Sequence, residues 1–499
     1  MGLVGLVGLV AHAARGGVGS GARLGARWGL AALAACLVAT GCGTRVSDAR
    51  VRTAAGIAGV EVVTESPSPV PAPLPASAAG PTAGAATGQP QESAPALAAP
   101  THQAPTAGAA GSGNPPAQPA TPASPTAAAG GPATGSTVVV GAIGTLSGPV
   151  GTIVGDIVKG IQIWAQYINA HGGVNGHVVK LVVGDDGGDP ARFNSLAQQM
   201  VEQNHAIAFV FTSLGLAPGG NNSYLDGKHV VTFGTEGGLD VAYQDPFVAT
   251  AVATGHAYAD SIINGFAQGA VPAGKTKLAV LTCSDFAACD NFDKEWSTAG
   301  TQQGTGFQVV YRARSSITQP DYTSECLAAQ QAGATAMIMA LDTASVERLA
   351  GGCARQGFHP LYGLPDELAL PSLAGDPNVD GAIVPSKIAP FIDRSVPGVK
   401  AIYDAYAQLA PGASPSGASL TGWTFGQFFA AAAAHLPANP SAQDVVDGLN
   451  QIKGNDLGGL TYPLTFTSGQ PSARRVCWSV SVVQNKAYTK VPGPTLQCK

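Results

Sequence analysis

The sequence predicts an α/β fold of two doubly wound lobes, each built on a parallel sheet. Short apolar runs of strand length alternate with helical patterns through residues 137–499. This alternation falls into two consecutive series. Strands that alternate with helices imply right-handed crossovers and parallel sheets covered on both faces. The length of this part also suits two lobes, at the usual ~100–200 residues per domain.

The first series contains four apolar runs that are predicted as buried strands. Helical patterns separate them, and glycine or proline clusters mark the turns. The predicted strands are 138–143, 178–183, 207–211 and 230–233, and the predicted helices are 157–170, 192–203 and 217–225.

The second series repeats this organisation and is followed by a helical stretch and a β-rich tail. Ligands of doubly wound folds bind outside the carboxyl ends of the strands, so two lobes of this kind are able to share one cleft. The predicted strands are 277–281, 308–311, 336–341 and 381–384, with helices at 257–267, 292–300, 322–332 and 345–356. The later helices are 399–409, 424–435 and 442–452, and the tail strands are 464–466 and 476–483.

The first 42 residues are predicted to be an export signal. Arg15, Arg23 and Arg27 precede a short apolar run at 28–40, which is the order of a secretory signal peptide. The run ends in Val38-Ala-Thr-Gly-Cys42, which resembles a bacterial lipoprotein cleavage box. We therefore expect Cys42 to carry lipid and to anchor an extracytoplasmic protein to the cell membrane. An ordinary signal peptide with an incidental cysteine is the alternative.

Residues 43–136 are predicted to form a disordered tether ahead of the folded module at 137–499. From Ser66 to Ser136 the chain is nearly all Ala, Pro, Gly, Ser, Thr and Gln, with Glu92 as its one charged residue. Such a composition buries too little apolar surface to offset the entropy of ordering. A flexible coil of this length suits a spacer between a membrane and a domain.

Charge and hydropathy exclude two classes of partner. The chain has a formal net charge of −5, whereas nucleic-acid binding requires a basic face. Downstream of the signal no apolar run approaches the ~20 residues of a spanning helix. We therefore expect no nucleic-acid partner, and membrane contact through the lipid anchor only.

Six cysteines remain once Cys36 and Cys42 are assigned to the signal and the anchor. An even number outside the cytosol favours disulfides, although six cysteines allow 15 pairings. We predict sequential pairing, because neighbours in the sequence fall on the same loop, unit or ribbon. Buried free thiols are the alternative. The predicted pairs are Cys283–Cys289, Cys326–Cys353 and Cys477–Cys498.

No motif in the folded part supports an enzyme, a cofactor or a metal. The stretch from Gly269 to Thr276 matches the phosphate-loop pattern, but a helical pattern precedes it and a strand follows, the reverse of what phosphate binding requires. No Gly-x-Ser-x-Gly elbow and no Cys-x-x-Cys occurs. The adjacent Asp185 and Asp186 are predicted to be solvated loop acids rather than a catalytic pair.

Three sequence blocks in the first lobe carry a resemblance to a known family. They are Gly144-Thr-Leu-Ser-Gly-Pro, Ile168-Asn-Ala-His-Gly-Gly-Val-Asn-Gly176 and Val183-Gly-Asp-Asp186. In this order and spacing they resemble the branched-chain amino-acid type of extracytoplasmic solute-binding proteins, which serve ABC importers. The resemblance implies a type I periplasmic-binding-protein-like fold. Its two lobes are joined by a three-segment hinge: lobe 1 at about 137–255 plus 386–455, and lobe 2 at about 256–385 plus 456–499.

The resemblance also implies where a solute binds. Family members hold an amino acid's carboxylate and ammonium with hydroxyls and backbone groups after the third and fourth strands, and pair the ammonium with an acid from the second lobe. The turn Gly363-Leu-Pro-Asp366 matches the position of that acid. The implied ligand-binding residues are Ser147, Ser213, Thr235, Glu236, Phe286, Asp342 and Asp366.

Two departures leave the ligand open. The family often has an aromatic residue after the Ser-Gly-Pro turn, but here the sequence continues Gly151-Thr-Ile-Val154. The hydroxyls after the third strand are reduced to Thr212 and Ser213. We therefore expect a small polar solute such as an amino acid, an amide or a short carboxylate, delivered unchanged to an ABC permease. The alternatives are a ligand sensor of the same fold that reports to a signalling partner, and an exported enzyme of two-lobed α/β fold.

Overall fold

The computed structural model describes residues 61–63, 131–213, 222–235, 237–300 and 304–499. All of them fall within one compact unit of the chain, residues 57–499. The predicted signal peptide with Cys42, most of the predicted tether, and Glu236 lie outside the described residues. Among the helices that are described, none is long and apolar enough to cross a membrane.

The first sheet has four parallel strands in the order β1-β3-β2-β4. The predicted fourth strand at 230–233 is not continuous, because this segment makes only isolated bridges: Thr232 to Phe209 and Val248, and Thr235 to Thr212. The strands are β1 (Glu61–Val63), β2 (Thr137–Gly144), β3 (Val178–Asp185) and β4 (Ala208–Thr212).

Strand β1 differs from the prediction for the tether. The sequence analysis placed Glu61–Val63 in a disordered stretch, whereas the structure pairs these residues with Val182–Gly184 on the outer edge of β3. Pairing with an open sheet edge satisfies backbone groups without any requirement for a buried side chain, and composition does not reveal it.

Helices cover both faces of the first sheet, as the doubly wound prediction requires. On one face, α2 (Gly151–Ala170) and α10 (Gly417–Ala432) join Val140, Ala142 and Phe211 in one apolar core. On the other face, Phe193 and Leu196 of α3 (Pro190–Glu202) join a separate core, to which Leu225 of the short α4 (Ser223–Gly227) also belongs. Helix α10 begins seven residues before the predicted start at 424, because Ser416 and Ser419 form a capping box that ends the preceding loop.

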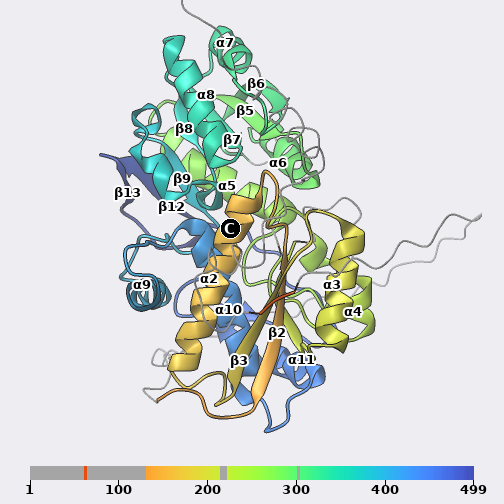
Figure 1. The fold of residues 1–499 in the computed structure, drawn as a ribbon. Helices are drawn as coiled ribbons and strands as arrows, with labels where there is room; N and C mark the ends of the chain where they lie inside the picture. Colours follow the sequence, from red (N-terminus) through yellow and green to blue (C-terminus); the bar gives the residue numbers. More distant parts are fainter. Residues whose placement is uncertain (1–60, 64–130, 214–221, 236, 301–303) are drawn as a thin grey trace, which may run out of the picture. The chain divides into compact units, whose positions relative to one another are not determined.

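Glycines let α2 and α10 approach one another at backbone distance (Figure 1). A Cβ on Gly160 would lie 1.9 Å from the carbonyl oxygen of Ser419, and one on Gly422 would lie 1.9 Å from that of Ile157. A Cβ on Gly426 would lie 2.2 Å from the ring of Trp164. The first lobe therefore depends on α10, which follows most strands of the second sheet in the sequence.

The second sheet contains eight strands in the order β13-β12-β9-β8-β7-β5-β6, with β14 paired to β12. The strands from β5 to β9 are parallel, and β12 joins β9 antiparallel. The sequence analysis did not predict β8, which has only three residues. The bounds are β5 (Lys277–Cys283), β6 (Gln308–Ser315), β7 (Ala336–Ala340), β8 (Leu361–Gly363), β9 (Ile383–Ser386), β12 (Cys477–Gln484), β13 (Ala487–Lys490) and β14 (Gln497–Cys498).

Two helices pack on each face of the second sheet. Apolar residues of α5 (Gly255–Ala270) and α6 (Ala287–Ser297) join Leu278 and Val280 of β5. Residues of α7 (Thr323–Gln331) and α8 (Thr343–Arg355) join Ala279 and Leu281 on the opposite face. Since α5 ends at Ala270 and β5 begins at Lys277, the stretch from Gly269 to Thr276 connects a helix to a strand. The rejection of a phosphate loop is thus supported.

The chain passes between the two sheets three times. It leaves the first sheet before α5, returns after β9 to form α9 (Pro397–Leu409), α10 and α11 (Ala442–Gln451), and crosses again before β12. The hairpin of β10 (Lys453–Asn455) and β11 (Leu464–Thr465) lies on the side of the first sheet.

The predicted boundary at residue 456 differs from the structure in this last part. The Phe466 ring stacks on Phe428 of α10 with centroids 5.1 Å apart, and the Ser472 backbone N–H donates to the Ala242 carbonyl oxygen. Residues 456–472 therefore pack with the first lobe, although the sequence analysis assigned them to the second. The remaining short 3₁₀ helices are Val241–Tyr243, Asp366–Leu368 (η2), Pro371–Gly375, Pro377–Val379 and Ala433–His435.

The three predicted disulfides are confirmed: Cys283–Cys289, Cys326–Cys353 and Cys477–Cys498 are bonded. The first closes the loop between β5 and α6, the second joins α7 to α8, and the third joins β12 to β14. Each bond lies within the second sheet or its helices, so none of them restricts movement between the two sheets.

Replacing Gly160 with Ala tests the close contact of α2 with α10. The added methyl group meets a backbone carbonyl that has no rotamer to change, so we expect the free energy of unfolding to fall by about 3 kcal/mol. Gly155→Ala is the matched control, because it lies in the same helix with open space around its Cβ position. The control should be neutral or gain up to ~1 kcal/mol from helix propensity. Equal effects of the two substitutions in urea denaturation would contradict the packing described here.

Candidate functional site

The turn that follows β2 is held in place by the two acids that follow β3. Asp185 accepts hydrogen bonds from the backbone N–H groups of Leu146, Ser147 and Gly187, at 2.9, 3.3 and 3.0 Å. Asp186 lies deeper and is 1% exposed. The turn is thereby positioned by charge-assisted hydrogen bonds, which are stronger than neutral ones.

The prediction that Asp186 is a solvated loop acid is wrong. Its carboxylate accepts from the Thr145 hydroxyl at 2.8 Å, from the Gly188 backbone N–H at 2.8 Å and from the Ser213 hydroxyl. Successive side chains at a strand end point to opposite sides, so the sequence predicts that the two adjacent acids point apart, but not that one of them is buried. One of the pair therefore remains half-exposed while the other is buried among donors.

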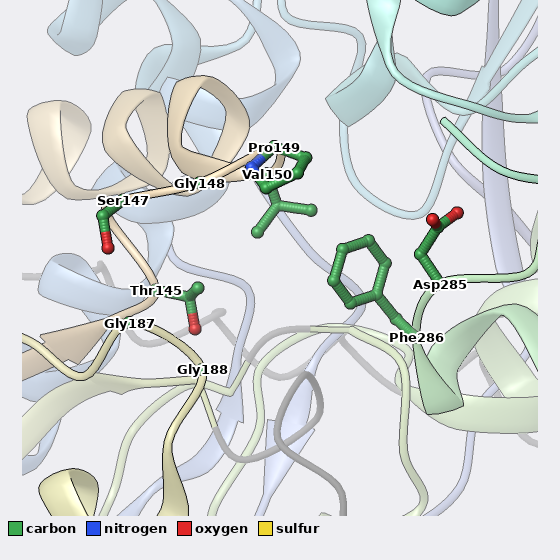
Figure 2. A pocket seen from close by; sticks show the side chains of 9 residues that line it. All are labelled: Thr145, Ser147, Gly148, Pro149, Val150, Gly187, Gly188, Asp285 and Phe286. Atoms are coloured by element: carbon green, nitrogen blue, oxygen red, sulfur yellow. The ribbon is translucent and has the colours of Figure 1, made fainter. Parts of the chain in front are cut away.

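A pocket of about 270 Å³ opens beside this turn. Its first wall comes from Thr145, Ser147 to Val150, Gly187 and Gly188, and its second from Asp285 and Phe286, which follow β5 of the other sheet. Figure 2 shows Val150 and Phe286 on opposite sides of the space. The pocket thus lies where strands of both sheets end, as the fold predicts. Of the predicted ligand-binding residues, Ser147 and Phe286 line it.

A smaller apolar cavity of about 70 Å³ shares Val150 and Phe286 with this pocket. Among the predicted ligand-binding residues Asp342 reaches it, although the carboxylate of Asp342 also caps α8 by accepting from the Ser345 backbone N–H at 3.3 Å. Its wall is otherwise apolar and suits an alkyl or aromatic group. The residues that line it are Val150, Ile153, Val154, Cys283, Phe286, Ala288, Cys289, Phe292, Ile317, Ala340, Leu341, Asp342 and Leu368.

Ser213 and Thr235 differ in what their hydroxyl groups do. The Ser213 hydroxyl donates to Asp186, so its proton is already engaged. The Thr235 hydroxyl is buried and has no hydrogen-bond partner among the described residues, and the same holds for Thr212, to which Thr235 is bridged. Because buried polar groups are normally hydrogen-bonded, these two hydroxyls are available to bind a polar group of a solute. Neither Ser213 nor Thr235 lines the two pockets described above.

Asp366 lies in η2 beneath the first turn of α10. It is 1% exposed, and a Cβ on Gly417 would lie 2.6 Å from its Oδ2 atom. Burial raises the pKa of Asp366 to about 7, and the neighbouring Glu367 carboxylate adds to this effect, while Ser386 and Lys387 oppose it. Asp366 lines neither pocket, and its role as a counter-ion for a solute stays a prediction.

A buried cation that the sequence analysis missed lies next to Asp366. Lys387 follows β9, is 2% exposed, and places its Nζ 3.1 Å from Glu367 Oε1. The same Nζ lies 3.9 Å from the centre of the Tyr258 ring. The sequence does contain a signal for it, since Lys387 is the one charged residue in the mainly apolar stretch from Ile383 to Ala389.

The described residues contain no group of three or more His, Cys, Asp or Glu side chains arranged to hold a metal ion. Glu236, the remaining predicted ligand-binding residue, lies outside the described residues.

Comparisons with known proteins match a family model to most of the folded part and find solved structures of the same fold. A family model described as periplasmic binding protein matches residues 137–486. A possible leucine/isoleucine/valine-binding protein from Rhodopirellula baltica SH 1 superposes with a TM-score of 0.58 at 18% identity, covering 72% of this chain and 97% of the other. A fatty acid ABC transporter substrate-binding protein from Thermomonospora curvata gives a TM-score of 0.58 at 18% identity, covering 74% and 92%. At these identities the likeness shows the fold.

Sequence comparison adds a shorter match. An amino acid binding protein from Pseudomonas aeruginosa is 37% identical over 73 residues, which are 15% of this chain. The match spans 20% of the length of that curated relative.

Replacing Asp186 with Ala should destabilise the first lobe. Three donors lose their acceptor in a buried setting, so the free energy of unfolding should fall by about 3 kcal/mol. Asp185→Ala is the matched control: it also removes three hydrogen bonds, but water reaches that half-exposed position, and we expect about 1 kcal/mol. The difference is measurable by urea denaturation at pH 7, and equal losses would show that Asp186 has no special role.

Asp366 should make stability depend on pH in a definite direction. Between about pH 4 and pH 7 the unfolded chain has lost the Asp366 proton while the folded chain keeps it, so this residue lowers stability as the pH rises. Asp366→Asn removes the titration. The stability difference is the unfolding free energy of Asp366→Asn minus that of the wild type. This difference should be larger at pH 8 than at pH 4, by up to about 4 kcal/mol. A difference that does not change with pH would contradict the assigned burial.

Proposed function

Because this chain belongs to the periplasmic binding protein family, we propose that it captures a small solute outside the cytoplasm and delivers it to an ABC importer. The observation that supports this most is the pocket between the Ser147–Val150 turn and Phe286. Its walls come from strand ends of both sheets, so a solute bound there stabilises the arrangement in which the two walls face each other. The importer would then recognise that arrangement.

The solute class is proposed from the names of similar proteins and from the cavity. Among the compared proteins are ones named for binding amino acids, for binding leucine, isoleucine or valine, and for carrying fatty acids. What these solutes share is a carboxylate joined to an apolar group. The apolar cavity beside Phe286 suits the second part, and the unpartnered hydroxyls of Thr212 and Thr235 suit the first.

We further propose that the protein binds without chemical conversion and is attached to the membrane through lipid on Cys42. The described acids near the pocket are engaged in holding turns or capping helices, as Asp185, Asp186 and Asp342 show. The cleavage-box pattern ending at Cys42 supports the anchor, and the three disulfides are consistent with an oxidising compartment.

A thermal-shift screen of the full chain against amino acids, amides and short carboxylates tests the function. A true ligand at a hundred times its dissociation constant adds about 2.7 kcal/mol of stability. Calorimetry should then give one solute per chain, and mass spectrometry should recover that solute unchanged. Recovery of a converted product would establish an enzyme instead.

Thr235→Val tests whether the unpartnered hydroxyl serves the solute. Because this hydroxyl has no partner among the described residues, its loss should leave the free energy of unfolding unchanged or slightly higher. Affinity for the solute should fall ten-fold or more. Thr250→Val is the matched control, since the buried Thr250 hydroxyl donates to the Val252 carbonyl at 2.8 Å: stability should fall and affinity should remain. The opposite pattern would remove Thr235 from the binding site.

A further inference from the structure

The disulfide at the end of β5 forms part of the wall of the proposed binding site. Cys283 is the last residue of β5, and Cys289 lies in the first turn of α6. Both cysteines line the apolar cavity, whereas the four other bonded cysteines of the described chain line neither that cavity nor the larger pocket. Phe286 lies within the loop that this disulfide closes, and it lines both spaces.

The backbone of this loop is fixed on both sides of Phe286. Before it, the Asp285 carboxylate accepts from the Ser316 hydroxyl at 2.6 Å and from the Ile317 backbone N–H at 2.9 Å. After it, the Phe286 carbonyl oxygen accepts from the Cys289 backbone N–H at 3.1 Å, and the disulfide ties this part of the loop to the end of β5. The Phe286 ring is apolar, so its position depends on packing and on how firmly this backbone is held.

The Phe286 ring faces apolar residues of the first lobe across the cavity. Val150 lies opposite the ring (Figure 2), and Ile153 and Val154 of the first turn of α2 line the same cavity. An alkyl or aromatic group in this space would therefore contact residues of both lobes. Dispersion contacts lose a quarter to a half of their attraction when a gap of about 0.5–1 Å opens, so the position of the ring affects how tightly such a group binds.

This disulfide closes a shorter loop than the other two do. Its cysteines are 6 residues apart in the sequence, compared with 27 and 21 residues for the other pairs. The stabilisation expected from restricting the unfolded chain increases with loop length, so this bond should contribute less to the stability of the protein than either of the others. Its position in the cavity wall therefore favours a role in binding over a role in global stability.

We infer that the Cys283–Cys289 disulfide is a positioning element of the binding site, which holds the Phe286 ring in place to contact the apolar group of the solute. This inference rests on the proposed function and adds to it a determinant of affinity. Without the bond, the loop would have to become ordered when the solute binds. A loop that is already rigid avoids this entropic cost, so the disulfide increases affinity without contacting the polar part of the solute.

The double variant Cys283→Ala, Cys289→Ala tests the inference by calorimetry on the full chain. The probes are leucine, phenylalanine and hexanoate, each of which carries an apolar group. The variant should bind the tightest of these probes at least ten-fold more weakly than the wild type does, a loss of roughly 1.4 kcal/mol. Cys477→Ala, Cys498→Ala is the matched control, because it removes a disulfide that joins β12 to β14 and lines neither space.

The control should lose more stability in urea denaturation than the first variant and keep the affinity of the wild type. Equal affinity losses in the two double variants, unchanged affinity in the first, or failure of the first to fold would overturn the inference. Binding of none of the three probes would also overturn it, but would leave the proposed function intact if the thermal-shift screen finds another solute. Chemical conversion of a probe would overturn the proposed function itself.

Phe286→Ala shows whether the disulfide acts through the ring. With the disulfide intact, this substitution should weaken binding of the same probe at least as much as loss of the disulfide does. Removing the disulfide as well should then change the affinity by less than about three-fold, because two groups that act through one contact are not additive. Fully additive losses would show that the disulfide does not position Phe286, and would overturn the inference.

Discussion

The contact of α2 with α10 is the constraint on which the two-lobed arrangement depends. Gly160 and Gly422 each face a carbonyl of the opposite helix, and their lack of side chains allows the helices to meet at backbone distance. Since α10 follows β9 in the chain, the first lobe is complete only when the chain returns from the second sheet. The chain has to cross between the sheets again after β9, because α10, which covers one face of the first sheet, follows β9 in the sequence.

The same helix links packing to the proposed binding site. Along one face of α10, Gly417 meets Asp366, Thr421 carries a buried hydroxyl without a partner among the described residues, and Phe425 packs under Gly234. Gly234 immediately precedes Thr235. One helix thus contacts the second-lobe segment that carries Glu367 and the first-lobe loop that carries Thr235. Movement between the lobes would therefore change the packing at both contacts.

The sequence predicted those parts of the fold that depend on regular patterns. Apolar runs predicted β2, β3, β5 and β7, and the cysteine positions led to the correct three disulfides. Short or irregular strand pairing was not predicted: β8 has three residues, and the predicted strand at 230–233 forms only isolated bridges. Periodicity requires more residues than these segments contain.

The sequence allowed the positions of some site residues to be predicted, but not the residues with which the site residues interact. Ser147 and Phe286 line the pocket because they follow strands, and the ends of strands can be predicted from a sequence. The buried roles of Asp186 and Lys387 depend on residues far along the chain, such as Ser213 for the first and Tyr258 for the second. Sequence separation hides such contacts, and the lysine was visible only as a charge in an apolar stretch.

A distance measurement between the lobes tests the central claim most directly. Spin labels placed through unnatural amino acids at the exposed Ser195 of α3 and Gln330 of α7 report on opposite lobes without disturbing the disulfides. Pulsed dipolar spectroscopy should show a broad distance distribution without solute, and a narrower one shifted to a new mean when the tightest-binding solute saturates the protein. A distribution that is the same with and without bound solute would contradict the account of two lobes that close on a solute between them.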